Sequence, residues 1–513
     1  MNSTMWIMVA FALYLAMMVA IGAVFSKKNQ NAEDYFLGGR SLGGFVAALS
    51  AQASDMSGWL LMGLPGAIFL SGISGDGWTA IGLFVGTVLN WLIVASPLRR
   101  YTIKAGNAVT LPIFFENRFG DKKKILMTVS SVIIALFFTV YCASAFASGG
   151  KLFSTVFAMD NYLLAMTIGA VVILLYTFLG GFLAVCTTDF IQGTLMLIAL
   201  VSVPVVAICI MNGDGTELTQ GLSAAGVENA SSFINPFTGA DAAHIISGFA
   251  WGLGYFGMPH ILVRFMAVKS DKEMNKSKAV AIIWVAISLF MACVIGVVGR
   301  AFMDPVLIEK TGSERVFIEM IDEVFINRIN APLVAGIFQC GILAAIMSTA
   351  DSQLLVSASA IAEDIYKGVI NKDAEDKKVL RISRITIVVI AIVAYIIAMD
   401  PNSSVMGLVS DAWAGLGAAF GPLVLCSLFW KRTNLQGAVA GLVSGALTVI
   451  IWDYIPVIQT AEGFITIGKS TGLYSLAVGF PVSLLCIVIV SLCTKAPSKE
   501  ITDMFEEVRK EKG

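Results

Sequence analysis

The sequence predicts an all-α protein that crosses a membrane many times. Of its 513 residues, 57% are hydrophobic and only 13% are charged, whereas soluble domains carry about 25% charged residues. Apolar runs of membrane-spanning length, about 20 residues each, recur along the whole chain. Lys and Arg, in turn, gather in alternate connections between these runs. Together these observations indicate a polytopic helical membrane protein with a single transmembrane domain, embedded in a lipid bilayer.

The apolar runs divide the chain into about thirteen transmembrane helices, which we number 0 to 12. The longest connections expected outside are 212–241 and 303–331, and the main inner ones are 27–42, 99–124, 268–278 and 365–381. The predicted spans are 5–26, 43–71, 77–98, 125–155, 161–185, 189–211, 242–267, 279–302, 332–364, 382–400, 406–429, 435–454 and 472–494.

The distribution of basic residues predicts the orientation. With the N-terminus outside, all but six of the 34 Lys and Arg fall on the cytoplasmic side, as the positive-inside rule requires. A miscounted span would reverse the sides beyond it, so an odd number of spans and a cytoplasmic C-terminus are expected. Run 5–26 has no basic residue before it and Lys27-Lys28 behind it, which favours an anchored helix over a cleaved signal peptide. The six exceptions are Lys151, Arg300, Lys310, Arg315, Arg328 and Lys469.

Span 1 carries an acid near its centre, in the segment Ala53-Ser54-Asp55-Met56-Ser57-Gly58. A charge at mid-membrane depth is costly and by default marks a functional site. Ser, Asp and Gly are poor helix formers that compete for backbone hydrogen bonds, so the helix is expected to break here. A break frees carbonyl groups that a cavity or a bound ion must satisfy. The alternative is a continuous helix in which Asp55 pairs with a neighbouring helix.

Span 6 contains a G-x-G-x-x-G pattern within Trp251-Gly-Leu-Gly-Tyr255-Phe-Gly257. A dinucleotide site would need a preceding strand, and the flanking sequence is membrane helix. We therefore expect an unwound segment that presents Trp251 and Tyr255 to a substrate, with Pro259 favouring a kink just beyond it. The alternative is glycines that serve close helix packing.

The two interruptions lie five spans apart, so the two broken helices cross in opposite directions. Paired broken spans in corresponding halves point to an inverted-repeat transporter. The repeats would be spans 1–5, residues 43–211, and spans 6–10, residues 242–429. The additions are helix 5–26, two C-terminal helices within 435–494, and the cytoplasmic tail 495–513.

Span 8 offers oxygen atoms for a monovalent cation. Ser348 and Thr349 are adjacent hydroxyl residues, and the carbonyl of Ala345 lies one turn before Thr349. Together with the carbonyls of Ala53 and Met56 at the span 1 break, they would supply five neutral oxygens, which suit a hard cation such as sodium. Alone, a Ser-Thr pair in a membrane helix is more often back-bonded packing.

Two further acids lie near predicted helix ends or turns. Asp189 stands at the start of span 5, where it is either an exposed N-cap or a group that assists ion release. Asp351 follows Ser348 by one turn, as a partner of Asp189 or as an interior acid with a hydrogen-bonded neighbour. The eight Cys all lie in apolar segments and predict neither disulfides nor a zinc cluster. His244 and His260 form no metal-ligand pattern and receive no role.

At this point the sequence resembles the solute:sodium symporter family, and within it the proline-transporting branch, over essentially its full length. The motifs that carry the resemblance are Tyr35-Phe-Leu-Gly-Gly-Arg40-Ser41-Leu-Gly, Ala53 to Trp59, Tyr141-Cys-Ala-Ser, Gly180-Gly-Phe-Leu-Ala-Val-Cys-Thr-Thr-Asp189, Trp251 to His260, and Ala344 to Gln353.

The resemblance implies a leucine-transporter-type fold, an inverted five-helix repeat with extra helices. It also implies a role for Arg40 and Asp189 in sodium coupling and release. Asp351 stands where some relatives carry a hydroxyl residue of a second sodium site, which leaves the coupling stoichiometry open. The implied sodium ligands are Ala53, Met56, Ala345, Ser348 and Thr349, and the implied substrate pocket contains Asp55, Ser57, Gly58, Tyr141, Trp251, Tyr255 and Pro259.

The expected function is sodium-driven import of L-proline across a bacterial-type plasma membrane by alternating access, with Na+ as the co-transported ion. No organic cofactor, no nucleic-acid partner and a functional monomer are expected. The same fold could carry pantothenate, a sugar or another amino acid instead. An intramembrane enzyme and a broken-helix channel are the alternatives of a different class, and the chain has no H-E-x-x-H motif to support the former.

Overall fold

The computed structural model describes residues 3–26, 32–179, 181–239, 241–303, 310–460 and 463–510. These residues are mostly helical. In the part of the chain so described, the sheet content is one antiparallel hairpin, β1 (Pro456–Thr460) and β2 (Gly463–Thr466). The prediction of an all-α protein is therefore confirmed, apart from this short hairpin between two helices near the C-terminus.

Most of the predicted spans correspond to long apolar helices. Ten segments of the described residues are long and apolar enough to cross a membrane, and the shorter α8 (Tyr162–Leu179) is apolar as well. The long helices are α1 (Ser3–Ser26), α4 (Leu64–Leu89), α7 (Ile125–Val156), α9 (Phe182–Gly213), α14 (Asp271–Phe302), α17 (Pro332–Ser359), α18 (Asp376–Ile397), α19 (Val405–Phe429), α20 (Leu435–Tyr454) and α22 (Ser475–Cys493).

Two predicted spans are interrupted at the positions that the sequence indicated. Span 1 consists of α3 (Gly44–Asp55), a gap at Met56–Gly58, then η2 (Trp59–Gly63) and the first part of α4. Span 6 consists of α12 (Ala242–Ala250), the tighter η4 (Trp251–Gly257) and α13 (Pro259–Ala267). Both helix breaks are therefore confirmed, and the alternative of continuous helices is wrong.

The turn between predicted spans 1 and 2 lies at Gly72. Its backbone has φ +74° inside the nominal helix α4, a conformation that a residue with a side chain rarely adopts. A Cβ there would also lie 2.5 Å from the carbonyl oxygen of Phe233. Span 2 then continues through η3 (Asn90–Val94) and α5 (Ala95–Lys104).

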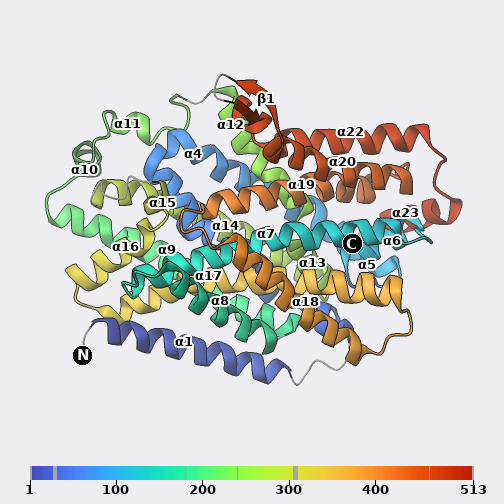
Figure 1. Ribbon diagram of the computed structural model, residues 1–513, viewed down its shortest axis with the longest axis horizontal. Helices are drawn as coiled ribbons and strands as arrows, with labels where there is room; N and C mark the ends of the chain where they lie inside the picture. Colours follow the sequence, from blue (N-terminus) through green and yellow to red (C-terminus); the bar gives the residue numbers. More distant parts are fainter. Residues whose placement is uncertain are drawn as a thin grey trace.

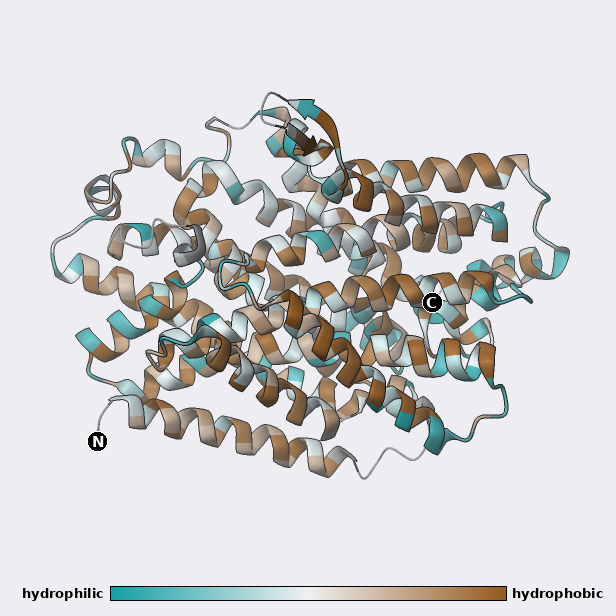
Figure 2. Ribbon diagram, viewed as in Figure 1, coloured by the Kyte–Doolittle hydropathy of each residue, from teal (hydrophilic) through white to brown (hydrophobic). Residues whose placement is uncertain are grey.

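Short elements lie in the connections between the long helices. Figure 1 shows α10, α11, α15 and α16 at one end of the molecule and α5, α6 and α23 at the other end. In Figure 2, hydrophobic residues follow the long helices and hydrophilic residues gather mainly at these ends. The side of the membrane on which each end lies stays a prediction of the charge pattern. The short elements used below are η1 (Gly38–Arg40), α6 (Leu111–Phe119), α10 (Leu218–Ala224), α11 (Ala230–Phe233), α15 (Lys310–Ser313), α16 (Val316–Asp322) and η7 (Ala360–Ile370).

The backbone of α4 touches the backbone of the interrupted span 6. Cβ atoms built on Gly82, Gly86 or Gly252 would overlap carbonyl oxygens of the facing segment, those of Gly248, Gly252 and Gly82 respectively. Only residues without side chains allow this approach. The glycine crossing, which we define as Gly82, Gly86, Gly248 and Gly252, therefore fixes α12 and η4 against α4.

The C-terminal tail is a docked helix, α23 (Lys499–Lys510). Phe505 and Val508 are buried. Ion pairs at its rim join Lys104 to Glu507 at 2.9 Å and Lys431 to Glu506 at 3.0 Å. Such exposed pairs are worth little, so the apolar face is what holds α23 against α5.

Candidate functional site

The break in span 1 is held open by local hydrogen bonds. The backbone N–H of Ser57 and the indole N–H of Trp59 both donate to the carbonyl oxygen of Asp55, each at 3.0 Å. Met56 has φ −82° and ψ 77°, which ends α3. Asp55, Met56 and Ser57 are at most 1% exposed, so this non-helical backbone is buried in protein, where membrane proteins tolerate it.

Four of the five expected sodium ligands lie together. The Ser348 hydroxyl lies 2.7 Å from the carbonyl oxygen of Ala53 and 3.2 Å from that of Ala345. The Thr349 hydroxyl lies 3.4 Å from the same Ala53 oxygen. This arrangement brings side-chain oxygens of α17 onto the last turn of α3. Met56, the fifth residue, is fully buried at the break itself.

Asp55 links the two broken spans. Its Oδ2 accepts a 2.7 Å hydrogen bond from the hydroxyl of Tyr255 in η4, and its Oδ1 has no hydrogen-bond partner among the described residues. The alternative in which Asp55 pairs with a neighbouring helix is thus partly realised, but across the second break. A buried carboxylate with one free oxygen is costly, which indicates a ligand.

Position 58, within the break, has no room for a side chain. A Cβ on Gly58 would overlap the hydroxyl oxygen of Ser148 in α7. Tyr141 lies two turns earlier on α7, is fully buried, and its hydroxyl has no partner of regular hydrogen-bond geometry among the described residues. α7 therefore lines the break in span 1, as expected of span 3.

Aromatic side chains surround the unwound segment of span 6. The Trp251 ring stacks on Tyr474 with centroids 5.0 Å apart. The indole N–H of Trp413, in α19, donates to the Trp251 carbonyl at 2.8 Å, and its ring meets Tyr255 edge-on at 5.0 Å. Trp413 and Tyr474 were missed by the sequence analysis, because a Trp or Tyr in an apolar span does not reveal which neighbour it faces.

Asp189 is not a helix N-cap. α9 begins at Phe182 after Gly181, so Asp189 lies two turns inside the helix and is fully buried. Gly181 is the N-cap of α9, in an extended conformation, and the apolar residues that follow it continue the helix backward from Asp189. The predicted limits of spans 4 and 5 are therefore wrong by several residues, and the N-cap interpretation of Asp189 is wrong.

Asp189 belongs to a buried polar network. Its Oδ2 accepts from the Ser50 hydroxyl at 2.7 Å and from the Arg264 guanidinium at 3.3 Å. Arg264 also donates to the hydroxyl of Ser352, which lies 3.3 Å from Asp351 Oδ1. Asp351 is thus an interior acid bonded to its neighbour, and Arg264 stands between it and Asp189. One oxygen of each acid has no partner in the described structure.

Arg264 was missed, although a signal existed. It is the only basic residue in the apolar helix α13, and a charge inside a span is by default functional. Without a spatial model, however, its partners in α3 and α9 are not recognisable. Arg264 is 1% exposed, so its charge is balanced inside the protein.

Arg40 lies apart from the ion site, in η1, with φ 52°. Its guanidinium donates to the carbonyl oxygens of Met266 and Ala108 at 2.6 and 2.7 Å, and to the side chain of Asn107 at 2.7 Å. Arg40 therefore ties the segment before span 1 to the end of span 6 and to the connection after span 2. It does not contact Asp189 through any of these bonds.

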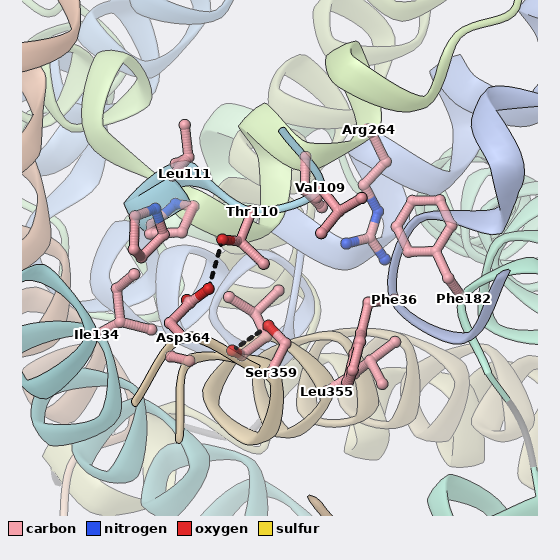
Figure 3. Close-up of a pocket in the computed structure, with 15 residues that line it drawn as sticks. Phe36, Val109, Thr110, Leu111, Ile134, Phe182, Arg264, Leu355, Ser359 and Asp364 are labelled. Atoms are coloured by element: carbon pink, nitrogen blue, oxygen red, sulfur yellow. Dashed lines mark hydrogen bonds between the residues drawn. The ribbon is translucent and has the colours of Figure 1, made fainter. Parts of the chain in front are cut away.

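A narrow cavity of about 20 Å³ lies between α6, α13 and α17 (Figure 3). Pro259 and Arg264 line it, and Thr110 donates a 2.7 Å hydrogen bond to the buried Asp364 at its other side. This volume holds about one water molecule. The Thr110–Asp364 bond joins the start of α6 to η7 beside this cavity.

A buried ion pair joins α7 to the segment before α16. Lys151, near the end of α7, pairs with Glu314, which is 4% exposed. Glu314 also accepts from the hydroxyl of Ser404 and from the backbone N–H groups of Val405 and Met406 at 2.9 to 3.2 Å. The acid thereby caps the N-terminus of α19, where the helix dipole favours an anion.

The chain is similar to known proteins over most of its length. The model of the sodium:solute symporter family matches residues 35–445. The chain is 45% identical to the high-affinity proline transporter PutP of Bacillus subtilis (strain 168), over 96% of this chain and 98% of that protein. It is 45% identical to the sodium/proline symporter of Escherichia coli (strain K12), over 98% and 95%.

Two solved structures share the fold. A Na+-coupled sialic acid symporter in its substrate-bound outward-open state superimposes with a TM-score of 0.75 at 19% identity, covering 96% of this chain and 99% of that one. Mhp1, a nucleobase-cation-symport-1 family transporter, gives 0.52 at 13% identity, covering 92% and 98%. The fold is of the leucine-transporter type, as expected from the two breaks. Because the family model matches residues 35–445 and the relatives are 45% identical, the chain belongs to the sodium:solute symporter family.

Proposed function

We propose that this protein imports L-proline together with sodium across the bacterial plasma membrane. The observation that carries the proposal is the meeting of Ser348 and Thr349 with the Ala53 carbonyl at the span 1 break. This cluster of neutral oxygens suits a hard monovalent ion. The relatives at 45% identity, which are named as proline transporters, support the choice of solute.

Sodium would bind at the oxygens of Ala53, Met56, Ala345, Ser348 and Thr349. In this structure both hydroxyls donate to the Ala53 carbonyl oxygen. A hydroxyl rotates freely about its C–O bond, so each can turn its proton away and offer a lone pair to the ion. Binding then ties the end of α3 to α17 and orders the residues that follow the break.

Proline would bind beside the ion, against the ordered break. Its carboxylate would meet the backbone amides around Ser57 and Gly58, since helix starts attract anions. Its ring would pack on Tyr141, Trp251 or Tyr255, and its cationic nitrogen would gain from the same rings. Asp55 would hold the opening through Tyr255 rather than ligate sodium, and Pro259 would keep the kink after the unwound segment.

Release would use the polar network beyond the ion site. Asp189 and Asp351 each hold an oxygen without a partner among the described residues. A sodium ion leaving Ser348 and Thr349 would meet these carboxylates next. Arg264 limits how long the ion stays, because a neighbouring cation repels it. Arg40 would act at a distance, by holding the segment before span 1 against the end of span 6.

Alternating access would rock one group of helices against another around this fixed site. Because the glycine crossing fixes α12 and η4 against α4, these elements of the two repeats, 43–211 and 242–429, would move together. Moving one charge inward is worth about 2.3 kcal/mol per 100 mV before any sodium gradient is added, which is enough to accumulate a neutral zwitterion. We expect one chain to suffice and no organic cofactor to be needed.

Uptake of labelled proline into proteoliposomes tests the proposal. With an inward sodium gradient, uptake should exceed that with potassium or choline by at least tenfold, and collapse when the gradient is dissipated. Sodium-independent uptake of the same rate would overturn the mechanism. A panel of unlabelled proline, pantothenate, sugars and other amino acids as competitors identifies the solute, and a conductance far above a carrier's turnover would indicate a channel.

A further inference from the structure

His260 is a buried side chain whose polar atoms are unused. It is the second residue of α13 and is fully buried. Neither ring nitrogen has a hydrogen-bond partner in the described part of the chain. The backbone of Ser54 lies within reach of the ring, yet no bond of regular geometry joins them. A neutral imidazole carries one donor and one acceptor, and leaving both unpaired inside a protein is unfavourable.

The ring faces the break in span 1. It meets Phe138 edge-on at 5.3 Å and Tyr141 at 6.3 Å with an interplanar angle of 87°. Oδ1 of Asp55 has no partner among the described residues, and Asp55 lies near enough to act on Tyr141 electrostatically. The hydroxyl of Tyr141 has no bond of regular geometry, although the side chains of Ser57 and Trp59 lie within its reach. Polar groups of α3, α7 and α13 with unused bonding capacity thus lie near one another.

The imidazole at this place is neutral. Arg264 follows one turn later on α13, and its guanidinium donates to the His260 carbonyl oxygen at 2.7 Å. A second cation beside it, far from water, would be strongly repelled. His260 therefore offers one N–H donor. It does so at the start of a nine-residue helix, where the backbone also favours an anion.

We propose that His260 donates its ring N–H to the carboxylate of the transported amino acid. The proposal rests on the proposed function and adds a specificity-determining residue to it. An imidazole nitrogen is a poor ligand for sodium compared with the oxygens of the ion site, whereas its N–H suits a carboxylate. Asp55 Oδ1, which has no partner among the described residues, accepts from the cationic nitrogen of the same solute. The carboxylate of the zwitterion thus meets His260, and its cationic nitrogen meets Asp55.

The test removes His260 and the substrate carboxylate, first separately and then together. Proline and prolinamide, in which an uncharged carboxamide replaces the carboxylate while the ring nitrogen stays cationic, are compared as competitors of labelled proline in wild-type protein and in His260→Leu. In the wild type, proline should compete far better than the amide. In His260→Leu, the half-saturating proline concentration should rise at least tenfold, while the amide changes little, so that the preference for the acid shrinks. The sodium concentration for half-maximal uptake at saturating proline should stay unchanged.

Two conservative variants serve as rescue. His260→Gln and His260→Asn each keep an N–H near one of the two ring nitrogens, and one of them should restore the preference for the acid. If His260→Leu does not fold, the comparison of these two variants with the wild type carries the test. His244→Leu is the matched control, because His244 is the only other histidine and its side chain is 61% exposed.

Several outcomes would overturn the proposal. A His260→Leu variant with unchanged proline affinity and a higher melting temperature would show that the histidine holds no ligand. Equal losses for the acid and the amide would show a structural or water-binding role. Absence of sodium-driven proline uptake in the wild type would instead defeat the proposed function, so the two failures are distinguishable.

Discussion

Two hydroxyl groups on α17 decide whether the break in span 1 can hold an ion. Ser348 and Thr349 are both fully buried, and both lie on the Ala53 carbonyl. In a helix, hydroxyl residues usually bond their own preceding turn. Ser348 also bonds Ala345 in its own turn, but both hydroxyls reach the Ala53 carbonyl in another helix. They matter because this carbonyl lies at the break in span 1.

Replacing Ser348 and Thr349 together by Ala should raise the sodium concentration for half-maximal uptake by about a hundredfold. A hydrogen bond to a charged group is worth roughly 1.5 kcal/mol or more, which is about tenfold per oxygen. Initial rates of proline uptake across a sodium series in proteoliposomes measure the change.

The matched control is Ser444→Ala with Thr448→Ala in α20. These hydroxyls bond only their own helix, to Gly441 and Ser444. This variant should keep the sodium dependence of the wild type. A similar shift in both double variants, or none in either, would remove Ser348 and Thr349 from the ion site.

Individual site residues could be predicted where a single local sequence pattern identified them. The cluster around Asp55 and the adjacent pair Ser348-Thr349 are recognisable without a structure, because charge, helix breaking and oxygen content coincide. Arg264, Trp413 and Tyr474 were not recognised as members of the site, since their roles arise from contacts between helices far apart in the chain.

At the scale of elements, the bond from Thr110 to Asp364 links α6 to η7. Thr110→Val should loosen this link and increase backbone hydrogen exchange in α6 by about tenfold. The reason is that leaving one partner of a buried hydrogen bond unpaired costs roughly 1 to 3 kcal/mol, and about 1.4 kcal/mol is a factor of ten. Exchange measured by mass spectrometry on the reconstituted protein provides the readout.

Thr110 also caps α6, accepting from Ile113 N–H at 3.2 Å, so the cap needs its own control. Thr110→Ser keeps both bonds and should behave as the wild type. Asp364→Leu leaves the cap intact but breaks the cross-link, together with the 3.5 Å bond from Ser131 in α7, and combining it with Thr110→Val should add little for the cross-link. Fully additive effects would show that the two side chains act independently.

The elements themselves were largely predictable, but their limits were not. Glycine and serine clusters inside apolar runs indicated both broken helices, because these residues weaken a helix wherever they stand. The start of α9 was placed too late, since Asp189 resembles an N-cap when its buried partners are unknown. The docking of α23 was also missed, because it depends on Phe505 and Val508 finding the surface of α5.

For the molecule as a whole, the stability of the segment that carries α16 should depend on pH. The pKa of Asp322 is raised to about 7, by burial first and by the nearby Glu319 second, against the opposing bond from Gln339 at 2.6 Å. Because the pKa in the folded state exceeds the ordinary value of 3.8, the stabilisation is complete below about pH 4. It is lost as the pH rises through 7, at about 1.4 kcal/mol per pH unit between the two values.

Hydrogen exchange in α16, corrected for its intrinsic pH dependence, should therefore be slower at pH 5.5 than at pH 8.5. Asp322→Asn should remove most of this difference, because an amide still accepts from Gln339 without titrating. Glu319, whose pKa is raised by burial against the opposing charge of Arg315, accounts for what remains. A difference unchanged by Asp322→Asn would assign the effect to other groups.

The fold of the whole molecule followed from hydrophobicity and symmetry, since the period and pairing of the spans are global patterns. Its orientation rests on charge alone. What the sequence could not reveal is how separate segments are joined. The Lys151–Glu314 pair and the cap on α19 join residues from three segments. Lys151 stands out as the only charged residue of its predicted span, but its partner Glu314 lies in a connection with several other acids.

The glycine crossing has a consequence for how such a transporter can evolve. At Gly82, Gly86 and Gly252, two backbones touch with no side chain between them, so even one added methyl group would push the helices apart. No other amino acid fits at these positions, so they cannot change step by step during evolution. A change of solute must therefore come from side chains such as Trp251, Tyr255 and His260, which face the site from a frame that is held constant. The same frame explains how one architecture can serve many solutes, because its geometry depends on the lack of side chains at these glycines.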